Sequence, residues 1–220
     1  LVFYKKRFSG GVFSQVDDPS FFLARQGKTD PWAELAATVS GFFSFKPLPG
    51  SDLTAQCRFP ARYFWLRRQL NWSNAELPQQ DCPNVQHLQD KLQAESIAVV
   101  FPAPYADSLS SMFGHTLLVF EKHGPGAEHR MLNYSLNFAA QIPRSVRYFN
   151  YVWNGINGGF PGEFSLNPYH AKLRFYSEFE NRDLWEYTLK LTRRQIDFLI
   201  LHAIELQNTR FDYYFIKENC

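Results

Sequence analysis

The most reactive pair of side chains in this sequence is a histidine, His115, and a cysteine at the far end, Cys220. His115 follows a glycine and opens an apolar run at 116–120, a pattern typical of a turn that leads into a strand. A histidine at such a position is held rigidly with its ring toward a cleft. A thiol beside it is the minimal equipment for nucleophilic catalysis by a thiolate. We interpret the rest of the chain as the frame that brings these two stretches together.

In a papain-like site the cysteine begins a helix, the histidine lies on a strand, and a polar side chain on a neighbouring strand orients the imidazole. Here the order is histidine, orienting residue, cysteine, which is the reverse of papain and matches a circularly permuted version of that fold. The ordinary alternative is that Cys220 packs in a core, because a lone buried cysteine is more often a packing residue than a nucleophile.

The other two cysteines, Cys57 and Cys82, flank a helical segment and are expected to form a disulfide, although two buried free thiols are the alternative. A disulfide here would stabilise the fold by about 3–4 kcal/mol in the chain-entropy model. It would also indicate an oxidising compartment such as a periplasm. Cys220 would then be an unpaired thiol, which in a secreted protein is a candidate for reactivity.

The composition excludes a nucleic-acid partner, because the 220 residues carry a net charge of only +2 and no long basic run. Aromatic residues make up 17% of the chain, which indicates either a thick core or an aromatic-lined cleft for a lipid or sugar. No apolar run approaches the roughly 20 residues that span a bilayer. The chain opens without an initiator methionine, so we expect that a signal peptide has been removed, and we expect that the natural protein continues with a helix after Cys220.

Residues 1–95 are predicted to form a mostly helical scaffold without chemistry of its own. Asp18 and Asp30 each precede a proline, a pattern that predicts an N-cap with proline at the first helical position. Helices are predicted at 20–26, 31–39, 61–70 and 83–94.

Residues 96–220 are predicted to form the catalytic core, with strands at 97–101, 115–121, 130–138, 183–191 and 211–216. On the third of these strands Asn133, Ser135 and Asn137 share one face by two-residue alternation. This polar stripe could supply the group that orients an imidazole. The alternative is a strand with one solvated face.

Residues 141–180 are rich in aromatic residues and glycine and are predicted to be irregular. So many aromatic residues argue against disorder, so we interpret the segment as a lid or cleft wall, with Tyr151, Trp153 and Phe160 as its principal side chains. Further on, Thr192 and Gln195 have the spacing of a capping box that starts a helix.

Several runs in fixed order, spread over nearly the whole chain, resemble a bacterial periplasmic family. It is the family named after the N-terminal periplasmic domain of the lipoprotein N-acyltransferase Lnb. The runs are Asp18-Pro-Ser-Phe-Phe-Leu, Asp30-Pro31 with Glu34-Leu35, Cys57-Arg-Phe-Pro-Ala-Arg-Tyr63, Ser111-Met-Phe-Gly-His-Thr116, Leu136-Asn-Phe138, Gly158-Gly-Phe-Pro-Gly162, Arg182-Asp-Leu-Trp-Glu-Tyr187, and Tyr213-Tyr-Phe with Glu218-Asn-Cys220.

The resemblance implies an α+β fold, with a circularly permuted papain-like (NlpC-like) antiparallel sheet and an N-terminal helical extension. His115 and Cys220 fall on the family's histidine and cysteine motifs. Asn137 is the choice for the third catalytic residue, with Asn133 and Ser135 as its rivals. Asn219, which precedes the cysteine, is a further supporting residue.

The activity implied is that of a periplasmic thiol acyltransferase or acyl hydrolase that works without a cofactor. Cys220 would take an acyl chain from a phospholipid and pass it to the free amine of a lipoprotein, and contact with the membrane would come through parts outside these residues. Two alternatives stay open. One is an NlpC-like peptidase or amidase acting on cell-wall peptides, with Arg144 and Arg147 as carboxylate ligands. The other is a binding or assembly module whose cysteine and histidine are catalytically silent.

Two other sites are set aside. The set His115, His123, His129 and Cys220 lacks the compact spacing of a zinc site, so no metal is expected. Glu178 and Glu180 could suggest a carbohydrate-cleaving pair, but residues two apart on a strand point the same way and no second partner is identifiable.

Overall fold

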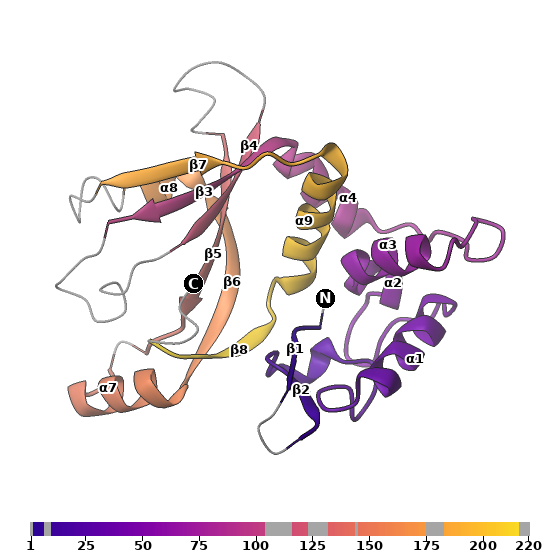
Figure 1. The fold of residues 1–220 in the computed structure, drawn as a ribbon, viewed down its shortest axis with the longest axis horizontal. Helices are drawn as coiled ribbons and strands as arrows, with labels where there is room; N and C mark the ends of the chain where they lie inside the picture. The colour runs from indigo at the N-terminus through magenta and orange to yellow at the C-terminus, as the bar shows by residue number, and fades with distance from the viewer. Residues whose placement is uncertain are drawn as a thin grey trace. The chain divides into compact units, whose positions relative to one another are not determined.

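The computed structural model describes residues 2–6, 10–103, 116–122, 132–143, 145–174 and 183–215 (Figure 1). The chain divides into two compact units. One consists of Leu1–Asp90 with Phe198–Thr209, and the other of Lys91–Asp197 with Arg210–Cys220. We call them the helical unit and the sheet unit, and describe each by itself. Within the described ranges no helix is long and apolar enough to cross a membrane.

The helical unit begins with a small antiparallel pair of strands and continues with helices (Figure 1). Its elements are β1 (Tyr4–Lys6), β2 (Val12–Ser14), the 3₁₀ helix η1 (Pro19–Phe21), α1 (Pro31–Phe42), α2 (Ala55–Arg58), α3 (Pro60–Gln69), most of α4 (Pro83–Leu92) and the part of α9 (Arg193–Leu206) from Phe198 onward.

Both predicted N-caps of the helical unit are present. Asp30 accepts from the backbone amides of Trp32 and Ala33, and Asp18 accepts from that of Ser20. The helix predicted at 20–26 is wrong, because only η1 forms there. The backbone amides of the two residues that would continue it, at 23 and 24, donate instead to a carboxylate of α1.

The predicted disulfide between Cys57 and Cys82 is confirmed. It joins α2 to the residue that precedes α4 and closes a loop with a sequence separation of 25. The chain-entropy model gives such a loop a stabilisation of about 3.5 kcal/mol. Of the three cysteines in the sequence, Cys220 is therefore the one outside this disulfide.

The sheet unit is built on a six-stranded antiparallel sheet with the order β7-β3-β4-β5-β6-β8. The strands are β3 (Ala94–Pro102), β4 (Leu117–Lys122), β5 (Tyr134–Ala140), β6 (Phe160–Pro168), β7 (Leu184–Thr188) and β8 (Arg210–Tyr213). The helices α7 (Tyr148–Asn157) and α8 (Tyr169–Arg174) precede and follow β6. From α8, Tyr169 and Leu173 pack on the apolar side chains of β3 and β4. The α+β class with an antiparallel sheet is thus confirmed.

The prediction that residues 141–180 are irregular is wrong, because α7, β6 and α8 lie there. Polar residues at 163, 165 and 167 alternate with Phe164 and Leu166, which is the period of a strand and a signal that the glycines nearby obscured. The predicted capping box is confirmed: Thr192 N donates to Gln195 Oε1 at 2.8 Å, and Gln195 N donates to Thr192 Oγ1 at 3.4 Å.

Candidate functional site

One end of the sheet collects an end of each of its six strands. β3, β5 and β8 finish there and β4, β6 and β7 begin there, as the antiparallel registers require. The register pairs are Val100 with Leu117, Leu117 with Asn137, Ala140 with Gly162, and Phe160 with Tyr213. α7 joins β5 to β6 at the same end. Segments that are far apart in sequence therefore leave the sheet at the same end of its strands, which we call the site end.

Two of the three predicted catalytic residues, His115 and Cys220, lie outside the described residues, as do Asn219 and Arg144. The third, Asn137, lies on β5 and is buried. It is directly opposite Leu117 of β4, so the two side chains share one face of the sheet. His115 precedes Leu117 by two positions in the sequence.

The rivals of Asn137, namely Ser135 on β5 and Asn133 immediately before β5, are also buried, so the alternative of a solvated face is wrong. The Oδ1 atom of Asn133 accepts a hydrogen bond from Lys122 N at 3.0 Å, at the opposite end of β4 from Leu117. Ser135 Oγ donates to Asn167 O at 3.4 Å. Both side chains therefore have contacts that tie neighbouring strands together.

Two polar residues of β6 extend this stripe and were missed from the sequence. Ser165 is directly opposite Asn137, and its Oγ donates to Asn137 O at 3.5 Å. Asn167 is opposite Ser135, and its Nδ2 donates to Ser165 Oγ at 2.9 Å. One face of β5 and β6 thus carries a four-residue polar patch that begins near the site end. The alternation within β6 is the signal that could have revealed it.

The segment that leads toward Cys220 is held on α7. Phe215 N donates to Gly155 O at 2.8 Å, and the Phe215 ring lies 5.0 Å from that of Tyr151 and 6.3 Å from that of Phe160. A Cβ atom at Gly155 would meet the Phe215 ring at 2.1 Å, so the approach requires glycine. Cys220 follows Phe215 by five positions.

The three residues predicted for a lid or cleft wall have different surroundings. Phe160 is buried, and its ring packs near that of Tyr151. Trp153, by contrast, is 70% exposed. Arg147 is exposed at the N-cap position of α7. Within the ranges that the structure describes, no group of His, Cys, Asp and Glu side chains could hold a metal ion.

Comparison with protein families matches residues 84–220, more than half of the chain, to the family described as the Lnb N-terminal periplasmic domain. The chain belongs to this family. The domain is therefore periplasmic, which agrees with its disulfide. No curated protein and no solved structure matches the chain.

The resemblance in the sequence suggested that the Lnb family covers nearly the whole chain, but the family match covers residues 84–220. Residues 1–69 match a different family, described as a domain of unknown function (DUF7843). This match covers most of the part of the helical unit that precedes Cys82 in the sequence.

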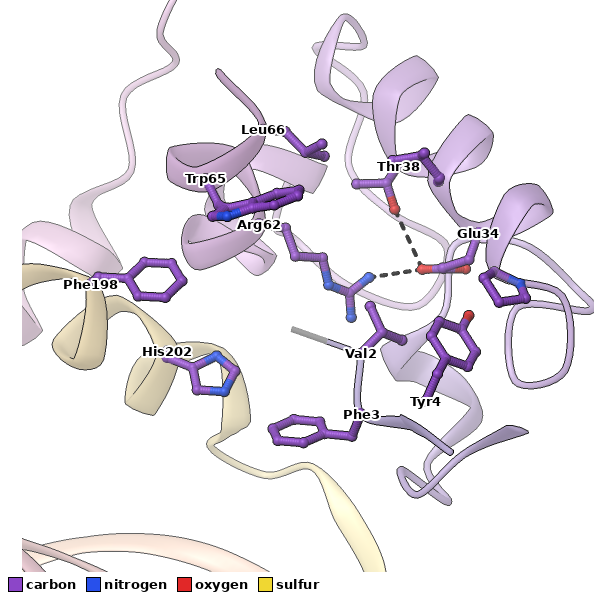
Figure 2. A pocket seen from close by; sticks show the side chains of 12 residues that line it. Val2, Phe3, Tyr4, Glu34, Thr38, Arg62, Trp65, Leu66, Phe198 and His202 are labelled. Atoms are coloured by element: carbon purple, nitrogen blue, oxygen red, sulfur yellow. Dashed lines mark hydrogen bonds and ion pairs between the residues drawn. The ribbon is translucent and has the colours of Figure 1, made fainter. Parts of the chain in front are cut away.

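The helical unit of this Lnb-family chain contains a cavity of about 540 Å³ (Figure 2). Its lining includes the apolar side chains of Phe3, Trp65 and Phe198, together with the charged side chains of Glu34 and Arg62. All these residues belong to the helical unit, and Figure 2 shows the ion pair between the two charged groups.

Arg62 is the centre of a buried network in which each guanidinium nitrogen donates a hydrogen bond. Nε donates to Glu205 at 2.8 Å, Nη1 to Glu34 at 2.8 Å, and Nη2 to the carbonyl oxygen of Phe21 at 2.7 Å. The guanidinium also lies 4.3 Å from the Phe21 ring and 4.0 Å from the Phe59 ring. Burial raises the pKa of Glu205, and Arg62 opposes that rise. The network holds η1, α1, α3 and α9 together, so its role is structural.

His202 of α9 adds a neutral polar group to the cavity lining. Burial lowers the pKa of His202 to about 4, so the imidazole is uncharged near neutral pH. Its ring centroid lies 5.5 Å from that of Phe3 and 6.3 Å from that of Phe198. Its Nδ1 atom is buried without a hydrogen-bond partner among the described residues.

Proposed function

We propose that this periplasmic Lnb-family domain is a thiol-dependent acyltransferase or acyl hydrolase in which Cys220 forms a thioester with an acyl chain from a phospholipid. The observation that carries this proposal is the convergence at the site end. The segments that lead to His115 and Cys220 adjoin strands β4 and β8 there, and a buried asparagine, Asn137, lies between them on β5.

The sheet geometry supports bringing the two groups together. In the sheet order β8 is three strands from β4, which is about 14 Å at the usual strand spacing. The seven residues from Tyr213 at the end of β8 to Cys220 span up to about 24 Å when extended. A thiol at Cys220 can therefore reach an imidazole that precedes β4.

Asn137 is the residue best placed to orient His115. Asn137 is directly opposite Leu117, the first residue of β4, and His115 precedes Leu117 by two positions in the sequence. The rivals Asn133, immediately before β5, and Ser135, near its start, are further from Leu117 along the chain of β5 and have the contacts described above. The resulting order, with His115 first, Asn137 second and Cys220 last, is that of a permuted papain-like site.

In the first half-reaction His115 takes the proton of Cys220, and the thiolate attacks the carbonyl carbon of the phospholipid ester. The carbon–oxygen ester bond breaks, and the lysophospholipid leaves with the proton from His115. In the second half-reaction an amine of a lipoprotein, or a water molecule, attacks the thioester and loses its proton to His115. The thiol is regenerated when the sulfur leaves and takes that proton.

The aromatic surroundings of the site end support an acyl substrate. Tyr151, Phe160 and Phe215 form an aromatic cluster there, and α7 exposes further aromatic side chains. The second candidate, a peptidase or amidase, is favoured by the exposed Arg147 at the N-cap position of α7, which could bind a peptide carboxylate.

Intact-mass spectrometry after incubation with phospholipid tests the proposal directly. An added acyl mass that hydroxylamine removes, and that is lost in Cys220→Ala, is expected. Because Cys57 and Cys82 are bonded to each other, an iodoacetamide probe reports on Cys220 alone in the oxidised protein. No acyl adduct with a fast-reacting thiol would favour the amidase. No adduct with an unreactive thiol at neutral pH would indicate a silent module.

A further inference from the structure

α7 presents a row of large apolar side chains to solvent. Phe149 is 86% exposed, Trp153 is 70% exposed and Ile156 is 53% exposed. These residues are spaced four and three apart, so they lie on one face of the helix. We call these three residues the outer face of α7. Tyr148 at the first position of α7 is also exposed, but it is three and seven positions from Tyr151 and Gly155 and therefore lies on their side of the helix.

The opposite face of α7 is packed. Tyr151 and Gly155 lie there, and they contact the ring and the backbone of Phe215 as described above. The helix is thus anchored by one face while the other projects apolar groups into solvent. Exposure of the outer face is therefore not a sign that α7 is detached from its unit.

Along the chain, the residues that flank α7 carry positive charge only. From position 131 to position 162 the sequence contains two arginines, Arg144 and Arg147, and no aspartate or glutamate. Arg147 is exposed and immediately precedes the helix. A basic flank beside tryptophan, tyrosine and phenylalanine is the combination that favours the interface of an anionic bilayer.

The size of the outer face fits an interfacial helix. Aromatic side chains bury about 150–250 Å² each, so Phe149 and Trp153 together supply roughly 400 Å². An interfacial helix needs only a few inserted side chains with electrostatic support.

We propose that the outer face of α7 inserts into the boundary between headgroups and acyl chains of an anionic phospholipid bilayer. α7 has ten residues and a length of about 15 Å, so it lies in the interface and does not span the bilayer. Because α7 is at the site end, this insertion would bring phospholipid esters toward Cys220. That consequence rests on the proposed function, whereas the binding itself does not.

Sedimentation with vesicles tests the proposal on the whole chain, with phosphatidylglycerol vesicles compared with phosphatidylcholine vesicles. The double variant Phe149→Ser/Trp153→Ser is expected to lower the partition coefficient on phosphatidylglycerol by at least about tenfold. The matched control is Trp32→Ser/Phe45→Ser, which removes two aromatic side chains that are 79% and 67% exposed in the helical unit. The control is expected to bind like the native chain.

A charge variant tests the electrostatic attraction to the bilayer, and a fluorescence measurement tests the insertion of Trp153. Arg147→Glu is expected to weaken binding to phosphatidylglycerol by several-fold, and high salt is expected to remove most of this difference. Brominated lipids are expected to quench the tryptophan fluorescence of the native chain, and Trp153→Phe is expected to lose most of that quenching.

The docking proposal is overturned if the native chain does not bind phosphatidylglycerol vesicles, or if the two double variants lose binding equally. It is also overturned if the outer face mediates self-association, which sedimentation velocity would reveal as a concentration dependence that Phe149→Ser/Trp153→Ser removes. Cys220→Ser is expected to bind vesicles like the native chain. If the chain is acylated by a short-chain soluble ester but does not bind vesicles, membrane docking of α7 is refuted and the proposed function is not. If the chain binds vesicles but forms no acyl adduct, the proposed function is refuted and membrane docking is not.

Discussion

Replacing Gly155 by alanine should disturb the segment that leads to Cys220 while leaving the sheet intact. An alanine Cβ would lie 2.1–2.4 Å from three atoms of the Phe215 ring. Ordinary contacts between such carbon atoms are about 3.5–4.0 Å, so the ring has to move by more than 1 Å. Phe215 is buried against Tyr151 and Phe160, so this movement also disturbs their packing.

Two opposing effects set the magnitude. Alanine in the interior of a helix is more favourable than glycine by roughly 1 kcal/mol. Overpacking a buried contact costs about 1–3 kcal/mol. With an overlap this large we expect the upper part of that range, and a net loss of about 1–2 kcal/mol in the free energy of unfolding of the sheet unit. If the proposed function holds, Cys220 alkylation at neutral pH should also slow by at least about tenfold, because the thiol leaves the imidazole.

Urea unfolding and the rate of iodoacetamide alkylation measure the two effects. Asn150→Ala, at an exposed position of the same helix, is the control and should change stability by no more than about 0.5 kcal/mol. Phe215→Leu removes the ring atoms that overlap, so it should restore part of the stability lost in Gly155→Ala, with a coupling of at least about 1 kcal/mol. The packing argument is refuted if Gly155→Ala is as stable as the native chain, or if the two changes are simply additive.

Three further predictions concern the helical unit and the polar stripe. Arg62→Met leaves two buried carboxylates without their cation and should destabilise the helical unit by about 3–5 kcal/mol, whereas the exposed Arg68→Met should have almost no effect in the same urea experiment. Asn137→Ala should lower the rate of thioester formation by more than tenfold with Cys220 still reactive to a small alkylating agent; an unchanged rate would remove it from the site. Because burial lowers the pKa of His202 in the folded state from 6.5 to about 4, the unfolded state binds the proton first as pH falls. Stability should therefore decrease from about pH 6.5 down to pH 4, and His202→Phe should flatten that part of the unfolding profile.

Local signals in the sequence predicted most of the secondary structure. An aspartate before a proline specifies a helix start by itself, as at Asp30, because the cap contacts lie within three residues. The same holds for the box formed by Thr192 and Gln195. Cys57 and Cys82, which flank a helical segment in the sequence, are predicted to pair, with free thiols as the alternative, and the disulfide is present. In residues 141–180 the glycines indicate irregular structure, whereas the alternation of polar and apolar residues indicates strand β6. The prediction of irregular structure there is wrong.

The buried network around Arg62 shows what local reasoning could not provide. Its carboxylate partners are 28 and 143 positions away in the sequence, and nothing in α3 distinguishes this arginine from its neighbours Arg67 and Arg68. From the sequence, residues 1–95 are therefore predicted only to be a scaffold. The structure adds a desolvated charge network that links η1, α1, α3 and α9 within the helical unit.

The sequence was enough to predict the α+β class, the periplasmic location, the disulfide and the candidate residues His115, Asn137 and Cys220. It could not predict that the polar stripe of β5 is buried, that β6 extends it, or that α7 turns one face to Phe215 and the other to solvent. Periodicity specifies which side chains share a face, whereas burial depends on which distant segment packs against that face.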